Sequence, residues 1–163
     1  MFSSTTDEWS TPQGFYDELN KEFNFTLDPC STHENHKCDT YFTLEDDGLN
    51  KDWSGHTVFC NPPYSVAENA CKPNCTKKKC KERGFHLTEY KAGQEDWIRK
   101  CYDENRNNGV KVVMLIPSRT DTIAFHKYIY KKLNVEIRFV KGRLKFGGST
   151  TGAPFPSMVV VFR

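Results

Sequence analysis

A nearly unbroken apolar run, Val110 to Ile116, most constrains the fold of this chain. Lys111 is its one charged residue, so the run fits a strand that is covered on both faces of a sheet. Apolar residues at helical spacing precede it in 97–102, ahead of a helix-ending Gly109, and follow it in 125–129. Strands that alternate with helices predict an α/β fold with a mainly parallel sheet.

Further elements continue this pattern towards both ends of the chain. Thr11 and Pro12 favour a helix over 12–23, because threonine is a good N-cap and proline suits the first helical position. Asp121 or Thr122 is expected to cap the helix around 125–129. We predict six more short strands, at 25–28, 41–42, 57–60, 135–140, 144–146 (after a turn at Gly142) and 158–162. The late strands favour an antiparallel edge.

Length and composition exclude several classes of protein. A chain of 163 residues suits one domain, and its 37% hydrophobic and 27% charged residues are typical of a globular protein. No apolar run approaches the about 20 residues of a membrane helix, and residues 1–10 lack the apolar stretch of a secretory signal. We therefore expect a single cytoplasmic domain over 1–163 whose cysteines are reduced or bind metal. The formal net charge of +2 leaves a nucleic-acid partner open.

The motif Asn61-Pro62-Pro63-Tyr64 directly follows the predicted strand 57–60. In open α/β sheets, ligands bind at the carboxyl ends of strands. Asn61 offers a side-chain carbonyl and Pro62 a main-chain carbonyl, and the prolines hold both acceptors in fixed directions. Such a pair can polarise a planar amino group, while Tyr64 provides a face on which a base can stack. A rigid proline-rich turn without chemistry is the alternative interpretation.

The stretch from Val58 to Tyr64 resembles the catalytic motif of amino-methyltransferases that use S-adenosylmethionine. Other segments occur in the order typical of the phage-type DNA N-6-adenine methyltransferase family, and the similarity covers nearly everything outside 65–93. These segments are Glu8-Trp9-Ser10-Thr11-Pro12, Leu27-Asp28-Pro29-Cys30, Asp46-Asp47-Gly48-Leu49, Met114-Leu115-Ile116-Pro117-Ser118-Arg119-Thr120-Asp121, Gly142-Arg143-Leu144-Lys145-Phe146 and Pro154-Phe155-Pro156-Ser157-Met158.

This resemblance implies a Rossmann-like S-adenosylmethionine-dependent methyltransferase fold. It also implies methyl transfer to the exocyclic amine of an adenine that is flipped out of DNA. The catalytic residues implied are Asn61, Pro62, Pro63 and Tyr64. The cofactor-binding residues implied are Thr11, Pro12, Asp28, Pro29 and one or both of Asp46 and Asp47. Cys30-Ser31-Thr32 stands where methyltransferases usually carry a glycine-rich loop.

Other functions fit the same residues. The paired acceptors suit any planar amine, so methylation of RNA adenine or of a protein glutamine is the nearest alternative. A non-catalytic, zinc-containing DNA-binding module on the same scaffold is a further one, and the missing glycine-rich loop favours it. The intact run from Asn61 to Tyr64 favours an enzyme, because a binding module does not need that geometry.

Residues 65–93 interrupt the α/β pattern and form an insertion rich in cysteine and lysine. The spacing Cys71-x3-Cys75-x4-Cys80-x5-His86 supplies three thiols and an imidazole, a set that tetrahedral zinc binds. A polar segment too short for its own core needs a metal to order it, so we predict a structural zinc ion. A flexible loop with reduced thiols is the alternative. Ordered by zinc, the segment would present a cationic surface suited to phosphates, formed by Lys77, Lys78, Lys79, Lys81 and Arg83.

Basic residues elsewhere suggest contacts with a DNA backbone. Arg119 follows the strand that ends at Pro117, so it should lie at the same sheet edge as Asn61. Lys141, Arg143 and Lys145 alternate along a predicted strand and would face one way. We expect Arg119 and this row to contact DNA, with a solvated face as the alternative for the row.

The remaining cysteines are interpreted as structural. Cys60 and Cys101 occupy apolar positions and are expected in the core. The group Cys30, His33, His36 and Cys38 is spaced too tightly to favour a second metal site.

Overall fold

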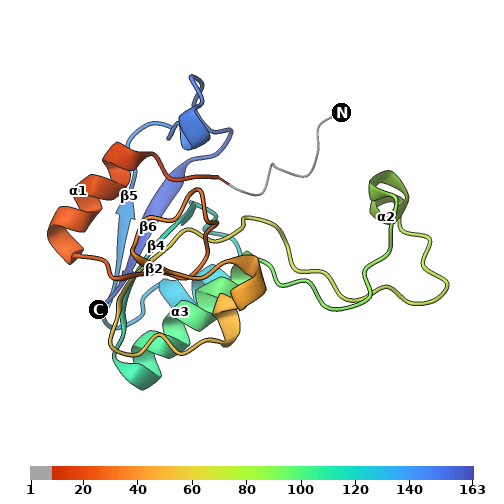
Figure 1. Ribbon diagram of the computed structural model, residues 1–163, viewed down its shortest axis with the longest axis horizontal. Coiled ribbons are helices and arrows are strands. Elements are labelled where there is room, and N and C mark those ends of the chain that lie inside the picture. Colours follow the sequence, from red (N-terminus) through yellow and green to blue (C-terminus); the bar gives the residue numbers. More distant parts are fainter. Residues whose placement is uncertain (1–8) are drawn as a thin grey trace.

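The computed structural model describes residues 9–163. Glu8 of the first family-like segment, and the other residues before Trp9 on which the expectation about a secretory signal rests, lie outside the described residues. The fold is mixed α/β, built on one sheet with the strand order β2-β1-β3-β4-β6-β5 (Figure 1). The strands are β1 (Leu27–Asp28), β2 (Thr40–Tyr41), β3 (Thr57–Cys60), β4 (Lys111–Pro117), β5 (Val135–Phe139) and β6 (Ser157–Phe162).

The sheet combines a parallel part with an antiparallel insertion. Strands β2, β1, β3 and β4 are mutually parallel, whereas β6 runs antiparallel between β4 and β5. The late strands thus pair antiparallel, as predicted, but the antiparallel strand β6 lies inside the sheet and β5 forms its edge. From β1 the chain moves outward to β2 and then returns to place β3 on the other side of β1. This reversal of strand order creates a crevice between the carboxyl ends of β1 and β3.

The core lies on both faces of the interior strands β4 and β6. Six consecutive residues of β4 and all six of β6 are buried, as the apolar sequence predicted. Helix α3 (Gln94–Asn108) packs against β4 and β6 and ends at Gly109, whose positive φ of 66° suits a helix C-cap. Helix α1 (Gln13–Phe23) lies on the opposite side of the sheet and packs Tyr16 edge-on against Phe59 (Figure 1).

The start of α1 differs slightly from the expectation. The helix begins at Gln13, Pro12 is its N-cap residue, and no side chain caps it. Thr11 is instead buried and its hydroxyl accepts a hydrogen bond from Asn61. The prediction that Thr11 caps the helix is thus wrong, because its side chain is used to hold the loop after β3. In the short η4 helix (Phe125–Ile129), the hydroxyl of Thr122 accepts a hydrogen bond from the Phe125 amide, as predicted.

The predicted strand at 144–146 is wrong. This stretch is irregular and leads into a short 3₁₀ turn, η5 (Phe146–Gly148), in which Gly147 and Gly148 have positive φ. Phe146 is buried against Trp9, and that contact draws the chain away from the sheet. Consequently Lys141, Arg143 and Lys145 are exposed on a loop and do not form a row on one strand face.

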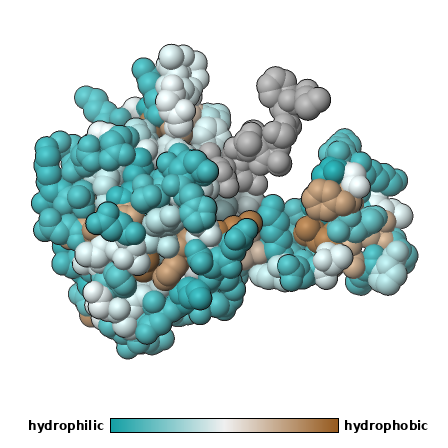
Figure 2. Space-filling model, viewed as in Figure 1, coloured by the Kyte–Doolittle hydropathy of each residue, from teal (hydrophilic) through white to brown (hydrophobic). Residues whose placement is uncertain are grey.

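Residues 65–93 form an arm that extends from the body of the molecule (Figure 1). The arm carries the short helix α2 (Lys78–Arg83), and its two legs are joined by a bridge between Glu68 and Lys91. Figure 2 shows the arm standing apart from the body, with hydrophobic patches among hydrophilic residues on its surface. Across residues 9–163, none of the helices combines the length and apolarity needed to cross a membrane.

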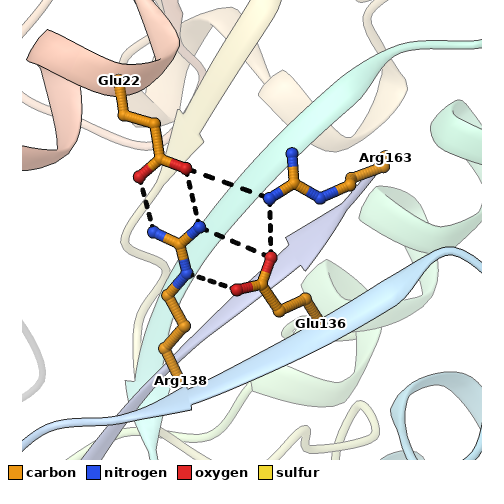
Figure 3. Close-up of polar contacts among 4 residues, drawn as sticks. All are labelled: Glu22, Glu136, Arg138 and Arg163. Atoms are coloured by element: carbon orange, nitrogen blue, oxygen red, sulfur yellow. Dashed lines mark hydrogen bonds and ion pairs between the residues drawn. The ribbon is translucent and has the colours of Figure 1, made fainter.

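A network of two arginines and two glutamates ties α1 to the edge of the sheet (Figure 3). Arg138 of β5 binds Glu22 of α1 through two hydrogen bonds of 2.6 and 2.7 Å. The same guanidinium contacts Glu136, which also binds Arg163 after β6. This network fixes α1 against β5 and β6, at the side of the sheet away from β2.

Candidate functional site

A pocket of about 970 Å³ opens where β1, β2 and β3 end. Its walls include residues 28–32, 43–44, 47–50 and 61–62, which follow these three strands. The pocket thus occupies the crevice at the reversal of strand order, where open α/β sheets bind ligands. Six of the predicted site residues line it: Thr11, Asp28, Pro29, Asp47, Asn61 and Pro62.

Asn61 is held by hydrogen bonds on both sides of its amide. Its Nδ2 atom donates to the main-chain oxygen of Trp9 and, at 3.0 Å, to the hydroxyl of Thr11. Its Oδ1 atom accepts a 2.6 Å bond from the hydroxyl of Tyr64. Because both N–H groups are used, the amide cannot rotate freely. The oxygen keeps a second lone pair for another donor.

Tyr64 supports Asn61 from inside the protein. Its hydroxyl lies 3.2 Å from the main-chain oxygen of Leu115 as well as 2.6 Å from Asn61. Burial raises the pKa of Tyr64 well above its usual range, so the hydroxyl stays protonated and can donate. Neither Tyr64 nor Pro63 lines the pocket, and Tyr64 is only 6% exposed.

An aromatic cluster that sequence reasoning missed surrounds Tyr64. Phe155 and Phe146 meet its ring edge-on, at centroid distances of 5.5 and 6.2 Å. Trp9 packs edge-on against both phenylalanines. A base could stack on Tyr64 only after these rings move. The family-like segments around Trp9, Phe146 and Phe155 carried this signal, but nothing in their spacing placed the three rings together.

Asp28 is a buried residue of the pocket wall. It is 3% exposed and accepts a 3.0 Å hydrogen bond from the main-chain amide of Lys37. Burial raises its pKa to about 6, more than the amides of Lys37 and Cys30 lower it. Near neutral pH this carboxylate therefore places a negative charge in the pocket.

Gly48 packs directly against the loop after β1. A Cβ atom there would collide with the main-chain oxygen of Pro29 and approach Trp97 to 3.3 Å. Gly48 is buried and lines the pocket. The loop after Leu27 contains no glycine in 28–32. The glycine that allows this loop to pack closely against another backbone segment is Gly48, on the other segment.

Asp46 and Asp47 have different surroundings in the structure. The carboxylate of Asp46 accepts hydrogen bonds from the amide and hydroxyl of Thr43, at 2.8 and 3.0 Å, and so caps its own short helix. Asp47 lines the pocket, where its carboxylate accepts a 2.6 Å bond from Asn50. Of the two, Asp47 is placed to contact a ligand.

The base of the arm forms one wall of the pocket, which the sequence did not indicate. Leu87, Glu89, Tyr90 and Lys91 line it together with residues of α3. The hydroxyl of Tyr90 donates a 2.7 Å hydrogen bond to Asp96 at the start of that helix. The arm is therefore continuous with the pocket wall.

The predicted metal ligands come together near the end of the arm. The ligand atoms of Cys71, Cys75, Cys80 and His86 all lie within 4.8 Å of one another. The sulfur of Cys80 is 3.5 Å from that of Cys71 and 3.7 Å from that of Cys75. Tetrahedral Zn–S bonds of about 2.3 Å place sulfurs about 3.8 Å apart, so these distances fit zinc. A hydrogen bond from His86 is the main cause that lowers the pKa of Cys71 to about 6.

Two of the other cysteines were expected in the core. Cys60 and Cys101 are fully buried in the core. Cys38 contacts the hydroxyl of Tyr16 at 3.4 Å, and His36 stacks on Tyr41. Within residues 9–163, the arm holds the one cluster of cysteines, histidines and acids with metal-binding distances.

Arg119 is placed as the sequence indicated. Strand β4 is parallel to β3, so Arg119, two residues beyond its end, lies at the same sheet edge as Asn61. It is exposed and does not line the pocket. Lys141, Lys145 and Arg143 are exposed, and Arg143 also donates to the main-chain oxygen of Ala153 at 3.3 Å.

Comparison with known families identifies the group to which this chain belongs. Residues 1–163 match the model of the family described as DNA N-6-adenine-methyltransferase (Dam). The chain belongs to this family.

The chain spans only part of the length of the individual relatives that it matches. The DNA N-6-adenine-methyltransferase of Haemophilus phage HP1 is 38% identical over 64 residues, which make up 38% of this chain and 37% of that protein. The protein of the same name from Escherichia phage T1 is 26% identical over 149 residues, 90% of this chain and 56% of that protein. A type I restriction-modification methyltransferase subunit from Streptococcus thermophilus superposes with a TM-score of 0.41 at 18% identity, covering 81% of this chain and 28% of that one.

Proposed function

We propose that this chain transfers a methyl group from S-adenosylmethionine to the exocyclic amine of adenine in DNA. Membership of the DNA N-6-adenine-methyltransferase family supports this reaction. The observation that carries the proposal is the meeting of Asp28 and Pro29 with Asn61 and Pro62 around one pocket, at the reversal of strand order. It provides a site for a charged donor beside a site for an amine.

We infer that the sheet is of the Rossmann-like methyltransferase type. Four parallel strands, three of which end at the pocket, support this inference, as does the antiparallel β6 between β4 and β5. The covered faces of β4 and β6 fit a layered α/β architecture.

The pocket fits S-adenosylmethionine in size and charge. Its volume of about 970 Å³ lies in the range of small-molecule sites. The donor carries positive charge, and Asp28 and Asp47 offer carboxylates to it. When bound, S-adenosylmethionine supplies an electrophilic methyl group whose bond to sulfur breaks as the amine nitrogen forms the new bond. The residues proposed to hold it are Thr11, Asp28, Pro29 and Asp47, which line the pocket, and Pro12, which adjoins Thr11 but does not line it.

The turn after β3 would hold and activate the adenine. Oδ1 of Asn61 and the main-chain oxygen of Pro62 accept the two hydrogens of the amino group and draw electron density onto its nitrogen. Pro63 fixes the direction of the turn. Once methylated, the nitrogen releases one proton to solvent. The base reaches this turn by leaving the DNA stack, and it packs against Tyr64 after Phe146 and Phe155 move aside.

Exposed basic residues would position the DNA. Arg119 stands at the same edge as Asn61 and contacts a phosphate close to the flipped base. Lys141, Arg143 and Lys145 contact the backbone from the loop before η5, as separate positive charges and not as a strand face.

Radiolabelled S-adenosylmethionine tests the proposal. Purified protein is incubated with DNA, RNA or protein extract, and we expect label in DNA that N61A reduces by about 100-fold or more. N108A, which changes an exposed asparagine at the end of α3, is the matched control and keeps full activity. Label confined to RNA or protein overturns the assignment of the substrate. If calorimetry detects no binding of S-adenosylmethionine, the chain is a binding module and not an enzyme.

We also infer that Cys71, Cys75, Cys80 and His86 bind one structural zinc ion. The convergence of these four ligand atoms supports this inference, as does the small apolar content of the arm. Protein prepared without a histidine tag should contain about one zinc per chain. C75S should lose the metal, whereas C38S, a control outside the arm, should keep it. A wild-type protein without zinc contradicts the inference.

A further inference from the structure

The arm holds an excess of positive charge that the rest of the chain does not share. Residues 65–93 carry six lysines and one arginine against three glutamates. Because the formal net charge of the whole chain is only +2, the remainder has more acidic than basic groups. A polyanion approaching this protein is therefore attracted chiefly to the arm.

Some of the basic side chains hold the arm together, and others are free to bind a partner. Lys79 and Arg83 both contact the carboxylate of Glu68 at 3.1 Å and so brace α2 against one leg. In contrast, Lys77 and Lys81 are exposed and make no ion pair within the described residues 9–163. They lie on either side of Cys80, a member of the metal-ligand cluster.

The legs of the arm are fixed where they meet the pocket. The main chains of Glu68 and Lys91 exchange hydrogen bonds of 2.9 and 2.8 Å. Below this bridge, a Cβ atom at Gly93 would collide with the backbone of Ala67, so the legs are packed backbone to backbone. Tyr90 on the same leg donates to Asp96 at the pocket wall. These contacts thus fix the base of the arm to the wall of the pocket.

We propose that the arm binds the phosphate backbone of duplex DNA beside the target base, with Lys77 and Lys81 as its main contacts. This proposal rests on the proposed DNA substrate. Phosphate groups suit lysine side chains as point charges, and such contacts position a duplex without reading its sequence. The arm projects from the side of the body that carries the pocket wall, so it would hold DNA while the base enters (Figure 1).

A charge-matched pair of variants tests the proposal. K77A/K81A removes the two proposed contacts and leaves Glu68 and the zinc ligands in place. K111A/K131A removes two exposed lysines near the amino ends of β4 and β5, at the opposite edge of the sheet. The binding of a labelled DNA duplex is followed by fluorescence anisotropy over a series of salt concentrations. Zinc content and thermal unfolding check that each variant is folded.

The expected result is specific to the arm. K77A/K81A should bind the duplex about tenfold or more weakly at low salt, and its slope of log affinity against log salt should be smaller by about 1 to 2. K111A/K131A should bind like the wild type. Equal binding by both variants overturns the proposal. Removing zinc should weaken the wild type to the level of K77A/K81A and change that variant little. An equal further loss in both would show that Lys77 and Lys81 do not act through the metal-ordered arm.

These outcomes are distinct from a failure of the proposed function. A wild-type protein that labels no DNA with S-adenosylmethionine overturns the methyltransferase proposal, whatever the salt slopes are. A wild type that labels DNA, together with a K77A/K81A variant of normal affinity and slope, overturns the proposal for the arm alone.

Discussion

The hydroxyl of Tyr64 donates a 2.6 Å hydrogen bond to the side-chain oxygen of Asn61, three residues before it. One residue of the motif thus positions another, because the hydroxyl of Tyr64 fixes the Asn61 amide that the proposed methyl transfer needs. Two other contacts, from Trp9 and Thr11, hold the opposite side of the same amide. The acceptor of the proposed site is thus aligned before any substrate arrives, which is the condition for electrostatic catalysis.

Replacing Tyr64 by phenylalanine tests this alignment. Y64F keeps the ring but removes the bond to Asn61, so we expect methyl transfer to fall by about 10-fold to 100-fold. Affinity for S-adenosylmethionine, measured by calorimetry, should not change, because Tyr64 does not line the pocket. The loss of a buried hydroxyl should also lower the free energy of unfolding by about 1–3 kcal/mol.

Y16F is the control for that variant. Tyr16 is also buried, and its hydroxyl contacts Cys38 at 3.4 Å, far along the chain from the motif. Y16F should therefore lose stability without losing methyl transfer. If Y64F and Y16F retain equal activity, Asn61 is aligned without help from Tyr64.

The buried carboxylate of Asp28 predicts an unusual dependence of stability on pH. Its pKa is raised to about 6, so between about pH 4 and pH 6 the native state holds a proton that the unfolded chain has lost. The contribution of Asp28 to stability is therefore present below pH 4, falls by about 3 kcal/mol through this window, and is level above it. Urea unfolding of D28N should lack this fall. A constant difference between D28N and the wild type from pH 4 to pH 7 would contradict the raised pKa.

The same titration should govern binding of the donor. Above pH 6, ionised Asp28 attracts a positively charged ligand, so affinity for S-adenosylmethionine should rise from pH 5 to pH 7 in the wild type. The affinity of D28N should stay lower and change much less. Calorimetry at several pH values makes the comparison. Parallel curves for both proteins would place the donor away from Asp28.

Gly48 should tolerate no side chain. A Cβ atom in G48A collides with the main chain of Pro29, so the walls of the pocket must separate. We expect affinity for S-adenosylmethionine to fall by about tenfold or more, together with stability. G14A is the matched control, because a Cβ atom at Gly14 in α1 meets nothing within 4 Å. G14A should raise stability by up to about 1 kcal/mol and leave affinity unchanged.

The ion-pair network around Arg138 should contribute stability that salt weakens. Hydrogen bonds from Arg138, and then from Arg163, lower the pKa of Glu136 to about 2. That contribution is present above about pH 4.5 and is lost as the pH falls towards 2. R138M should lower the melting temperature by a few degrees at neutral pH and low salt, and less in 1 M salt. K21M, which breaks the exposed Lys21–Glu18 pair on the same helix, should have a smaller effect. Equal shifts for both variants would show that the network adds nothing beyond an ordinary surface pair.

Sequence reasoning predicted the elements whose pattern is local. The apolar run at 110–116, the helix-ending Gly109 and the strand 57–60 were all placed within a residue, because burial on two faces and backbone conformation leave direct marks on residue type. The four candidate metal ligands in the arm, predicted from their spacing, also converge in space. The strand at 144–146 was wrong, since the contact of Phe146 with Trp9 depends on residues far away in the chain.

The chain by itself thus determined the α/β class, the proline turn after β3, and the grouping of three cysteines and a histidine in the arm, because each depends on neighbouring residues. Only the tertiary structure decided that Thr11 and Trp9 hold Asn61 in place. It also decided that Asp47 and not Asp46 lines the pocket, and that Gly48 packs directly against the main chain of Pro29. These relationships join segments that are distant in sequence, and packing between elements fixes them. The type of a residue does not specify which distant residue it will contact in the folded protein.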